Sequence, residues 1–313
     1  MIYKMAKPLV SILVGTHNRR ELLKHSLRSI FAQEVDVEVI VVRTAGDTEA
    51  LMIREIQDDR VKVLQSPWAN YFGPLLNMGI KEAKAQWFFD LADDDMLPPG
   101  ALIALLEVAE GHQADIVSGV HFNIEANTSW DDISDRPAPR ASRVHDYTWK
   151  RLIHPFPRQP MPGYSLFRTS TIRDISVDEA RRVYVDSLFG ISAFARSRHA
   201  IYTNMPIYAY RKHQGQITNT LDPIEGYKFI TETIAWAAAE FPEIRSFTRE
   251  HKSAALRSLA GIYYANHLPW EVGKCALSMA LNTPIVTMHQ TWWKMVGHSL
   301  ARGFQNSLSP RAH

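Results

Sequence analysis

The first half of the chain alternates short apolar runs with segments in which apolar residues recur at helical spacing. The runs that are typical of strands are Leu9–Val14, Val37–Val42, Val61–Leu64, Trp87–Phe89 and Asp115–Phe122. Helical segments of roughly ten to fifteen residues separate most of them. Strands and helices that alternate in this way form right-handed βαβ units. The pattern therefore predicts an α/β fold with a mostly parallel, Rossmann-like sheet that is covered by helices on both faces.

The segments between the strands carry helix signals of their own. Asn18 followed by Glu21 has the spacing of a capping box, which predicts that a helix begins there. Two further helices are expected over Thr48–Gln57 and Leu75–Ala85, and another begins after Pro99. These helices supply the connections that parallel strands require.

Polar residues follow several of the predicted strands directly. Thr16–Asn18 follow the first strand, Arg43–Asp47 the second, and Asp93–Asp95 the run that begins at Trp87. In parallel sheets, ligands bind at the carboxyl ends of the strands, which meet at one edge. The sequence therefore predicts a binding site at this edge.

Asp93, Asp94 and Asp95 form an uninterrupted acidic cluster. A pair of unit charges about 4 Å apart near a protein surface costs roughly 4 kcal/mol, so such a cluster favours a bound cation. Oxygen ligands suit Mg²⁺ or Mn²⁺, with positions left for water or phosphate. The alternative is that one aspartate caps the next helix and the others are solvated.

The second half of the chain changes character twice. A long polar stretch runs from Glu125 to Tyr147, and helical pattern dominates after Asn219. We therefore divide the chain into an α/β domain, 1–218, and a C-terminal helical region, 219–313. The start of the polar stretch divides the domain into a first half over about 1–124 and a second half over about 125–218.

Composition narrows the class of protein. The chain has 313 residues, 46% of them hydrophobic, and a formal net charge of +2, which gives no argument for nucleic acid as a partner. Cys275 is the only cysteine, so an intrachain disulfide is excluded. The chain has neither the pattern of a signal peptide nor an apolar run of the ~20 residues that span a bilayer. A cytoplasmic protein is expected.

The C-terminal region has a basic, tryptophan-bearing pattern. Trp293, Val296, Leu300 and Phe304 share one helical face, and no acidic residue follows Glu271. Such a helix can lie on an anionic membrane, which would place the protein peripherally at its inner face. The alternative is that the face docks on the protein's own domain.

Several longer segments occur in a characteristic order. They read PLVSILVGTHNRRELLKHSLRSIFAQ, EVIVVRTAGD, NYFGPLLNMGIKEAKAQWFFDLADDDMLPPGAL, YVDSLFGISAFAR and YAYRKHQGQIT. In order and spacing they resemble the family 2 glycosyltransferases of the GT-A fold, with their acidic DxD cluster followed by Pro-Gly. The resemblance covers roughly the first two-thirds of the chain. It implies that 1–218 is a catalytic domain with a nucleotide-sugar half over about 1–124 and an acceptor half over about 125–218. It implies inverting transfer from a nucleoside-diphosphate sugar to a glycan or lipid-linked acceptor.

The resemblance gives the acidic cluster a task. It implies that the cluster holds a divalent ion, Mn²⁺ or Mg²⁺, which stabilises the charge of the leaving diphosphate. Asp95 is the first choice for direct coordination, while Asp93 lies nearer the ribose and Asp94 helps to bind the nucleotide. His213 is similar to the family residue that supplies a late metal ligand or phosphate contact. The alternative for His213 is a solvated loop histidine.

Asp186 is the candidate general base. Family members carry a Glu-Asp pair here, but Val185 replaces the glutamate in this chain. An inverting transfer needs one carboxylate to take the proton of the acceptor hydroxyl. The alternative is that Asp186 only caps a helix, with Asp178 and Glu179 as less favoured bases.

The nucleotide pocket departs from the family pattern. The resemblance assigns nucleotide contacts to Thr16, His17, Asn18 and Asn77, with His17 in place of the usual stacking tyrosine. Arg43 stands where related chains carry an aspartate that accepts a hydrogen bond from uracil, and arginine has only donors. Arg43 could instead contact a base carbonyl or a phosphate. UDP is the first choice of nucleotide, with dTDP and GDP as alternatives.

Two other functions remain open. A non-catalytic protein that binds a sugar nucleotide would explain Val185 and Arg43. A nucleotidyltransferase that makes sugar nucleotides has a similar sheet, but it needs a Gly-rich, Arg-containing loop after the first strand, and Gly15-Thr16-His17-Asn18 is not such a loop.

Overall fold

The structure is a computed structural model. It describes residues 8–47, 58–67, 72–149, 164–181, 185–216, 223–242, 245, 256, 259–263 and 268–282. The chain splits into two compact units: the first holds the described residues up to 148 and 164–216, and the second holds Trp149 and those from 223 onward. The predicted helix Thr48–Gln57 and the apolar face from Trp293 to Phe304 lie outside the described residues.

The first unit is built on an eight-stranded sheet in the order β3-β2-β1-β4-β7-β5-β8-β6. The strands are β1 (Val10–Thr16), β2 (Val37–Arg43), β3 (Val61–Gln65), β4 (Trp87–Ala92), β5 (Ile116–Glu125), β6 (Val144–Asp146), β7 (Ser165–Arg168) and β8 (Ala200–Lys212). β1 pairs in parallel with β2 and β4, and β5 pairs in parallel with β8. The short strands β7 and β6 are antiparallel. The prediction of a mostly parallel sheet is confirmed.

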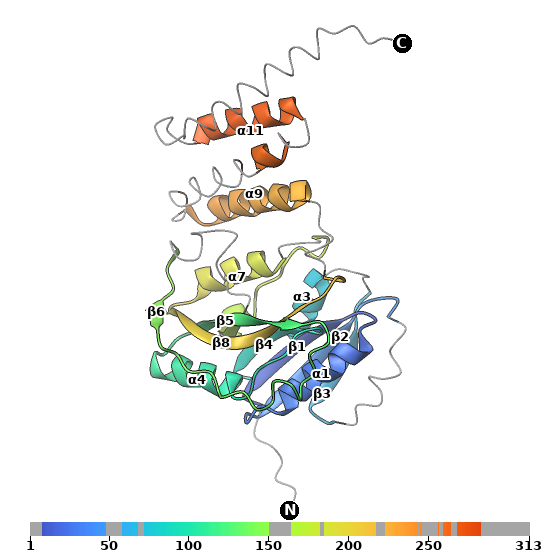
Figure 1. The fold of residues 1–313 in the computed structure, drawn as a ribbon. Helices are drawn as coiled ribbons and strands as arrows, with labels where there is room; N and C mark the ends of the chain where they lie inside the picture. Colours follow the sequence, from blue (N-terminus) through green and yellow to red (C-terminus); the bar gives the residue numbers. More distant parts are fainter. Residues whose placement is uncertain are drawn as a thin grey trace, which may run out of the picture. The chain divides into compact units, whose positions relative to one another are not determined.

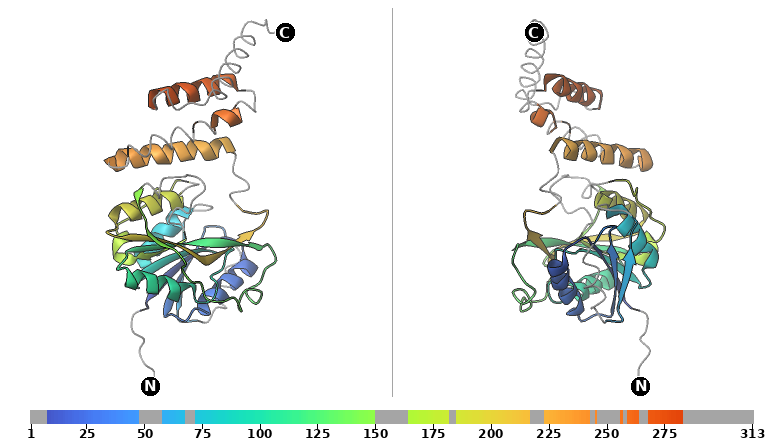
Figure 2. Two further views of the ribbon diagram at one scale, coloured as in Figure 1. Left: turned by 60° about the vertical axis from the view of Figure 1, so that its left-hand side comes forward. Right: turned by 90° about the vertical axis from the view of Figure 1, so that its right-hand side faces the viewer.

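Helices cover both faces of this sheet (Figures 1 and 2). α1 (Arg20–Phe31) and α4 (Ala101–Gly111) lie on one face, and α3 (Phe72–Glu82) and α7 (Val185–Arg196) lie on the other; α6 (Thr169–Ile172) is one turn after β7. Alternate residues of a strand point to opposite faces. Ile12 of β1 belongs to the core that also contains residues of α1 and α4. Leu13 faces α3, where a Cβ added to Gly79 would lie only 2.7 Å from Leu13 Cδ1.

The predicted capping box at the start of α1 is wrong. The helix begins at Arg20, and its N-cap is Arg19, which makes no capping hydrogen bond through its side chain. Asn18 has a φ of +51°, in the left-handed region, so the chain turns before the helix starts. The side chain of Arg19 makes ion pairs with Asp93 and Asp94 instead of serving the helix end.

Four of the parallel strands end at the same edge of the sheet. β1 ends at Thr16, β2 at Arg43, β4 at Ala92 and β8 at Lys212. The chain segments that follow these strands are far apart in sequence. The parallel arrangement brings the acidic cluster after β4 and the histidine after β8 into one place.

The second unit is helical in its described part. α9 spans Pro223–Glu240 and α11 spans Pro269–Asn282. Proline is the first residue of α9, a position at which its fixed φ suits a helix. Apolar side chains of α11 form a core of their own together with Leu256, Leu259, Ala260 and Tyr263. A search of the helices in the described residues found none that combines the length and apolar character needed to cross a membrane.

Candidate active site

The three aspartates after β4 are buried. Asp93, Asp94 and Asp95 have relative exposures of 4%, 7% and 2%. Ser26 of α1 secures the turn, since its Oγ lies 2.9 Å from the carbonyl oxygen of Asp93 and 2.5 Å from that of Asp95. Burial, together with the charge of Asp94, raises the pKa of Asp93 to about 6 and that of Asp95 to about 7. The site therefore holds carboxylates that favour a nearby positive charge.

Arg211 of β8 holds the acidic turn in place through hydrogen bonds from its backbone and its side chain. It is only 1% exposed, its backbone N–H donates to Asp95 Oδ1 at 2.7 Å, and its Nε donates to the carbonyl oxygen of Asp94 at 2.6 Å. Its Nη1 donates to the carbonyl oxygens of Glu125, Ala126 and Thr128. Arg211 belongs to the segment YAYRKHQGQIT, but the sequence pattern alone indicated no role for it. Its position two residues before His213 was the available signal.

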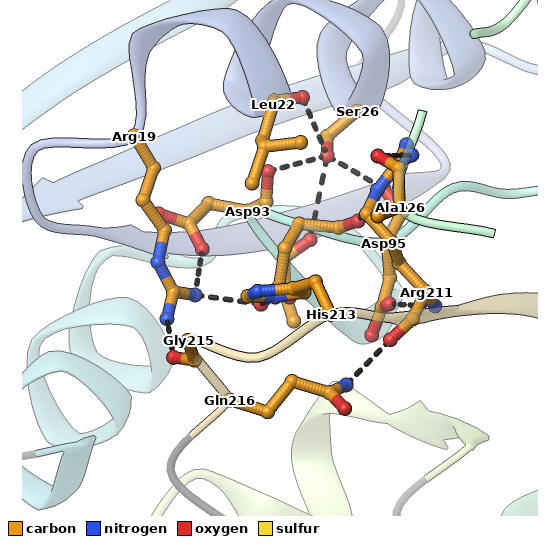
Figure 3. A network of polar contacts seen from close by, with 12 residues as sticks. Arg19, Leu22, Ser26, Asp93, Asp95, Ala126, Arg211, His213, Gly215 and Gln216 are labelled. Atoms are coloured by element: carbon orange, nitrogen blue, oxygen red, sulfur yellow. Dashed lines mark hydrogen bonds and ion pairs between the residues drawn. The ribbon is translucent and has the colours of Figure 1, made fainter. Parts of the chain in front are cut away.

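His213 and Arg19 reach the acidic cluster from two sides (Figure 3). His213 Nε2 lies 3.0 Å from Asp94 Oδ2. Arg19 Nη1 donates to Asp93 Oδ1 at 3.0 Å and to Asp94 Oδ2 at 2.7 Å. Arg19 Nη2 also donates to the carbonyl oxygen of Gly215 at 3.3 Å. The structure thus brings the predicted His213 to the cluster and adds Arg19, which sequence reasoning missed.

The carboxylate and imidazole groups of this site fit a divalent ion that also binds the phosphate groups of a substrate. In the part of the chain that the structure describes, no three ligating side chains converge as a ready-made metal site. Asp94 and His213 are the pair that meets, whereas Asp95 Oδ1 is engaged by the Arg211 N–H. Mg²⁺ is commonly held by one or two carboxylates together with substrate phosphates. The contact between Asp94 and His213 makes these two side chains a candidate ligand pair, and direct coordination by Asp95 stays a prediction.

Asp186 lies in the first turn of α7. The helix already includes Val185, so Asp186 is inside it and not at its cap. Its Oδ1 accepts a hydrogen bond from the N–H of Ser187 at 2.8 Å, and its side chain reaches solvent. The protein packed around this carboxyl nevertheless raises its pKa above the ordinary value, and the hydrogen bond offsets only part of that effect. A solvent-accessible carboxylate with a raised pKa suits a general base.

A second carboxyl group, that of Asp90, lies close to Asp186. Asp90 is on β4, and its neighbour two residues earlier, Phe88, contacts Phe189 of α7 with ring centroids 6.5 Å apart. Asp90 therefore points to the α7 side of the sheet. Its Oδ1 is buried and has no hydrogen-bond partner among the described residues. Burial raises the pKa of Asp90 to about 8, and the charge of Asp186 contributes to this rise. In the sequence, the feature that could have drawn attention to Asp90 is its position as a carboxylate inside an apolar strand.

Replacing Asp90 by asparagine is expected to remove a pH-dependent loss of stability. Between the ordinary pKa of 3.8 and about 8, folded Asp90 keeps a proton that the unfolded chain has lost. The free energy of unfolding therefore falls as the pH rises through this window, by at most about 1.4 kcal/mol per pH unit. Between pH 5 and pH 8, the melting temperature of Asp90→Asn should rise steadily relative to that of the wild type. Exposed Asp174→Asn is the control, and a constant difference for Asp90→Asn would contradict the prediction.

The predicted nucleotide residues gather at the ends of β1 and β2. Thr16 and Arg43 are neighbours in the sheet register, and the Thr16 side chain also hydrogen-bonds to Asp93. His17 Nδ1 lies 2.5 Å from Thr44 Oγ1, and Asn18 Nδ2 lies 3.4 Å from His17 Nε2. This edge is continuous with the acidic cluster.

The side chain of Arg43 donates hydrogen bonds to the loop that follows β2. Its Nε donates to Asp47 Oδ2 at 3.1 Å, and its Nη2 donates to the carbonyl oxygen of Asp47 at 3.0 Å. The arginine that replaces the family's aspartate is therefore paired with an acid four residues later. A nucleotide would compete with Asp47 for this guanidinium.

Asn77 of α3 is used within the fold. Its Nδ2 donates to the carbonyl oxygen of Val177 and to Glu179 Oε1, and its Oδ1 accepts from the N–H of Val177. These contacts fix the segment that contains Asp178 and Glu179. They are structural, and a contact between Asn77 and a nucleotide stays a prediction.

The arrangement resembles that of solved structures at low sequence identity. TarS residues 1–349 from S. aureus, in complex with UDP-GlcNAc, superpose with a TM-score of 0.59 at 16% identity, covering 95% of this chain and 81% of that one. The mannosyltransferase PcManGT from Pyrobaculum calidifontis, in complex with GDP-Man and Mn²⁺, gives a TM-score of 0.54 at 15% identity, covering 98% and 89%. These likenesses show the fold, and the GT-A type expected from the sequence is confirmed.

Sequence comparison identifies the family. The succinoglycan biosynthesis protein ExoO of Rhizobium meliloti is 31% identical over 225 residues, which are 68% of this chain and 64% of that protein. The chain thus spans slightly less than two-thirds of this relative. The profile of glycosyl transferase family 2 matches residues 11–175, more than half of the chain and all of β4 with its acidic cluster. The chain belongs to glycosyl transferase family 2.

Proposed function

We propose that this protein transfers a sugar from a nucleoside-diphosphate sugar to a hydroxyl group of a glycan or lipid-linked acceptor. Membership of glycosyl transferase family 2 and the polysaccharide role named for ExoO support the reaction class. The structural neighbours contain UDP-GlcNAc or GDP-Man, which supports a sugar nucleotide as donor.

One observation supports the proposal most strongly: the acidic cluster and the candidate base both act electrostatically on the same side chain, that of Tyr164. The charges of both Asp95 and Asp186 act on the hydroxyl of Tyr164 and raise its pKa, after burial, which has the largest effect. Tyr164 is therefore near both carboxylates. A diphosphate at the cluster would thus lie beside a carboxylate that can accept a proton.

In the proposed mechanism, Asp186 takes the proton of the acceptor hydroxyl as its oxygen attacks the anomeric carbon from the face opposite the leaving group. This geometry inverts the anomeric configuration. Asp94 and His213 would hold a divalent ion, Mn²⁺ or Mg²⁺, whose chemistry is to stabilise negative charge on the departing nucleoside diphosphate. Asp93 and Thr16 would contact the nucleotide next to it.

The most detailed part of the proposal concerns which base the nucleotide carries. UDP is preferred from the family resemblance, and the Arg43–Asp47 pair sets a condition on it. Either Asp47 accepts a hydrogen bond from the base once Arg43 moves, or Arg43 donates to a base carbonyl. dTDP offers the same imide group as UDP, whereas GDP offers a purine edge.

Thermal shift measurements with UDP, dTDP and GDP, each with and without Mn²⁺, test the proposal. We expect one nucleotide to raise the melting temperature by several degrees, and more so with Mn²⁺, because a ligand that binds only the folded state stabilises it. Release of nucleoside diphosphate from the matching sugar nucleotide then separates a transferase from a protein that only binds. Stabilisation without any release over a panel of donors would favour the binding protein, and no stabilisation by any nucleotide would contradict the proposal.

A further inference from the structure

Arg19 occupies the position among the carboxylates that a cation would take. Its Nη1 lies 3.0 Å from Asp93 Oδ1 and 2.7 Å from Asp94 Oδ2. Asp94 Oδ2 is also the atom that His213 Nε2 approaches to 3.0 Å. The guanidinium therefore contacts the same carboxylate oxygen, Asp94 Oδ2, that would coordinate an ion.

The two carboxylates in this contact are more deeply buried than the guanidinium. The side chain of Arg19 is 28% exposed, whereas those of Asp93 and Asp94 are 5% and 10% exposed. Charge-assisted hydrogen bonds to shielded carboxylates are among the stronger polar contacts in proteins. The third contact, from Nη2 to the carbonyl oxygen of Gly215 at 3.3 Å, ties the guanidinium to the loop that follows β8. Arg19 thus links α1, the turn after β4 and the β8 loop.

The position of Arg19 in the chain explains why it can take this place. It is the N-cap of α1 and comes three residues after the end of β1, which is hydrogen-bonded directly to β4. Its side chain therefore starts from the same sheet edge as the acidic cluster. Because the side chain of Arg19 makes no capping hydrogen bond to α1, the guanidinium can leave the carboxylates while α1 stays in place.

We propose that Arg19 is a resident counter-cation of Asp93 and Asp94, which a divalent ion must displace when it binds. In the metal-free protein the guanidinium offsets the repulsion between adjacent buried carboxylates. When an ion binds to Asp94 and His213, the guanidinium is released toward the anionic diphosphate that accompanies the ion. This inference rests on the proposed function only in the identity of the ion. It predicts that Arg19 weakens metal binding in the absence of nucleotide.

Mn²⁺ binding to the full chain without nucleotide tests the inference. Isothermal titration calorimetry should show that Arg19→Ala and Arg19→Gln bind Mn²⁺ about tenfold more tightly than the wild type, a difference of about 1.4 kcal/mol. Arg19→Gln keeps hydrogen-bonding groups near the carboxylates and removes only the charge. Arg20→Ala is the matched control, because it removes the same charge from the adjacent, exposed position.

Melting temperatures provide a second readout, which a merely structural role would not produce. Without metal, both Arg19 variants should melt at lower temperature than the wild type, and saturating Mn²⁺ should restore most of the difference. Equal or weaker Mn²⁺ binding by the Arg19 variants would overturn the inference and leave the proposed function standing. Absence of Mn²⁺ binding in every variant and in the wild type, with and without nucleotide, would overturn it together with the metal-assisted mechanism.

Discussion

Replacing Asp186 by asparagine is expected to lower the rate of nucleoside diphosphate release from the preferred sugar nucleotide by about 10²- to 10⁴-fold. The amide has nearly the shape of the carboxyl but cannot take the proton of the attacking hydroxyl or water. Its oxygen can still accept the hydrogen bond from the N–H of Ser187, so α7 should begin as before. Nucleotide binding, measured by thermal shift with Mn²⁺, should stay within a factor of about two.

Asp178→Asn provides the matched control for this prediction. Asp178 is an exposed carboxylate whose Oδ1 accepts a hydrogen bond from the N–H of Ala180, and it was a less favoured base in the sequence analysis. This variant should release nucleoside diphosphate at close to the wild-type rate. If Asp178→Asn lost activity while Asp186→Asn kept it, the role of general base would pass to Asp178. Loss of nucleotide binding by Asp186→Asn would instead point to a role in assembling the site.

Replacing Asp94 by asparagine is expected to abolish the Mn²⁺-dependent part of nucleotide binding, with a loss of affinity of about 10²-fold. The neutral amide is a poor ligand for a hard divalent ion. Asp94 Oδ2 is also the atom on which Arg19 and His213 converge, so it is a carboxylate oxygen that already lies beside the candidate histidine ligand. Titration of the nucleotide with and without Mn²⁺ measures the effect directly.

Two further variants provide a control for this prediction and a test of the alternative ligand. Asp131→Asn removes an exposed carboxylate that pairs with Arg28, and it should leave Mn²⁺-dependent binding unchanged. Asp95→Asn tests the ligand that the sequence analysis preferred. Because an amide oxygen can still accept from the buried N–H of Arg211, this variant should melt close to the wild type without metal. If Asp95→Asn folded normally and alone removed the Mn²⁺ dependence, Asp95 would be the direct ligand.

The sequence determined the alternation of strands and helices, and with it the edge at which the polar segments meet. Apolar periodicity is a local property, because each strand or helix buries one of its own faces wherever it packs. The parallel order of β1, β2 and β4 followed from the helices between them. Thr16, Arg43 and Asp93 could therefore be assigned to one edge before any coordinates were known. The prediction failed at the start of α1, where the contacts of Arg19 outweigh a local capping signal.

Only the tertiary structure decided which side chains meet at that edge. Arg19 and Arg211 are about 190 residues apart in the sequence, yet one lies on each side of the acidic turn. The pairing of β8 with β5, with β7 inserted between β5 and β4, brings Arg211 and His213 to it. No local pattern encodes this strand order, since it depends on how whole elements pack together. The same holds for Asp90, whose raised pKa arises from burial beneath α7 and from the charge of Asp186.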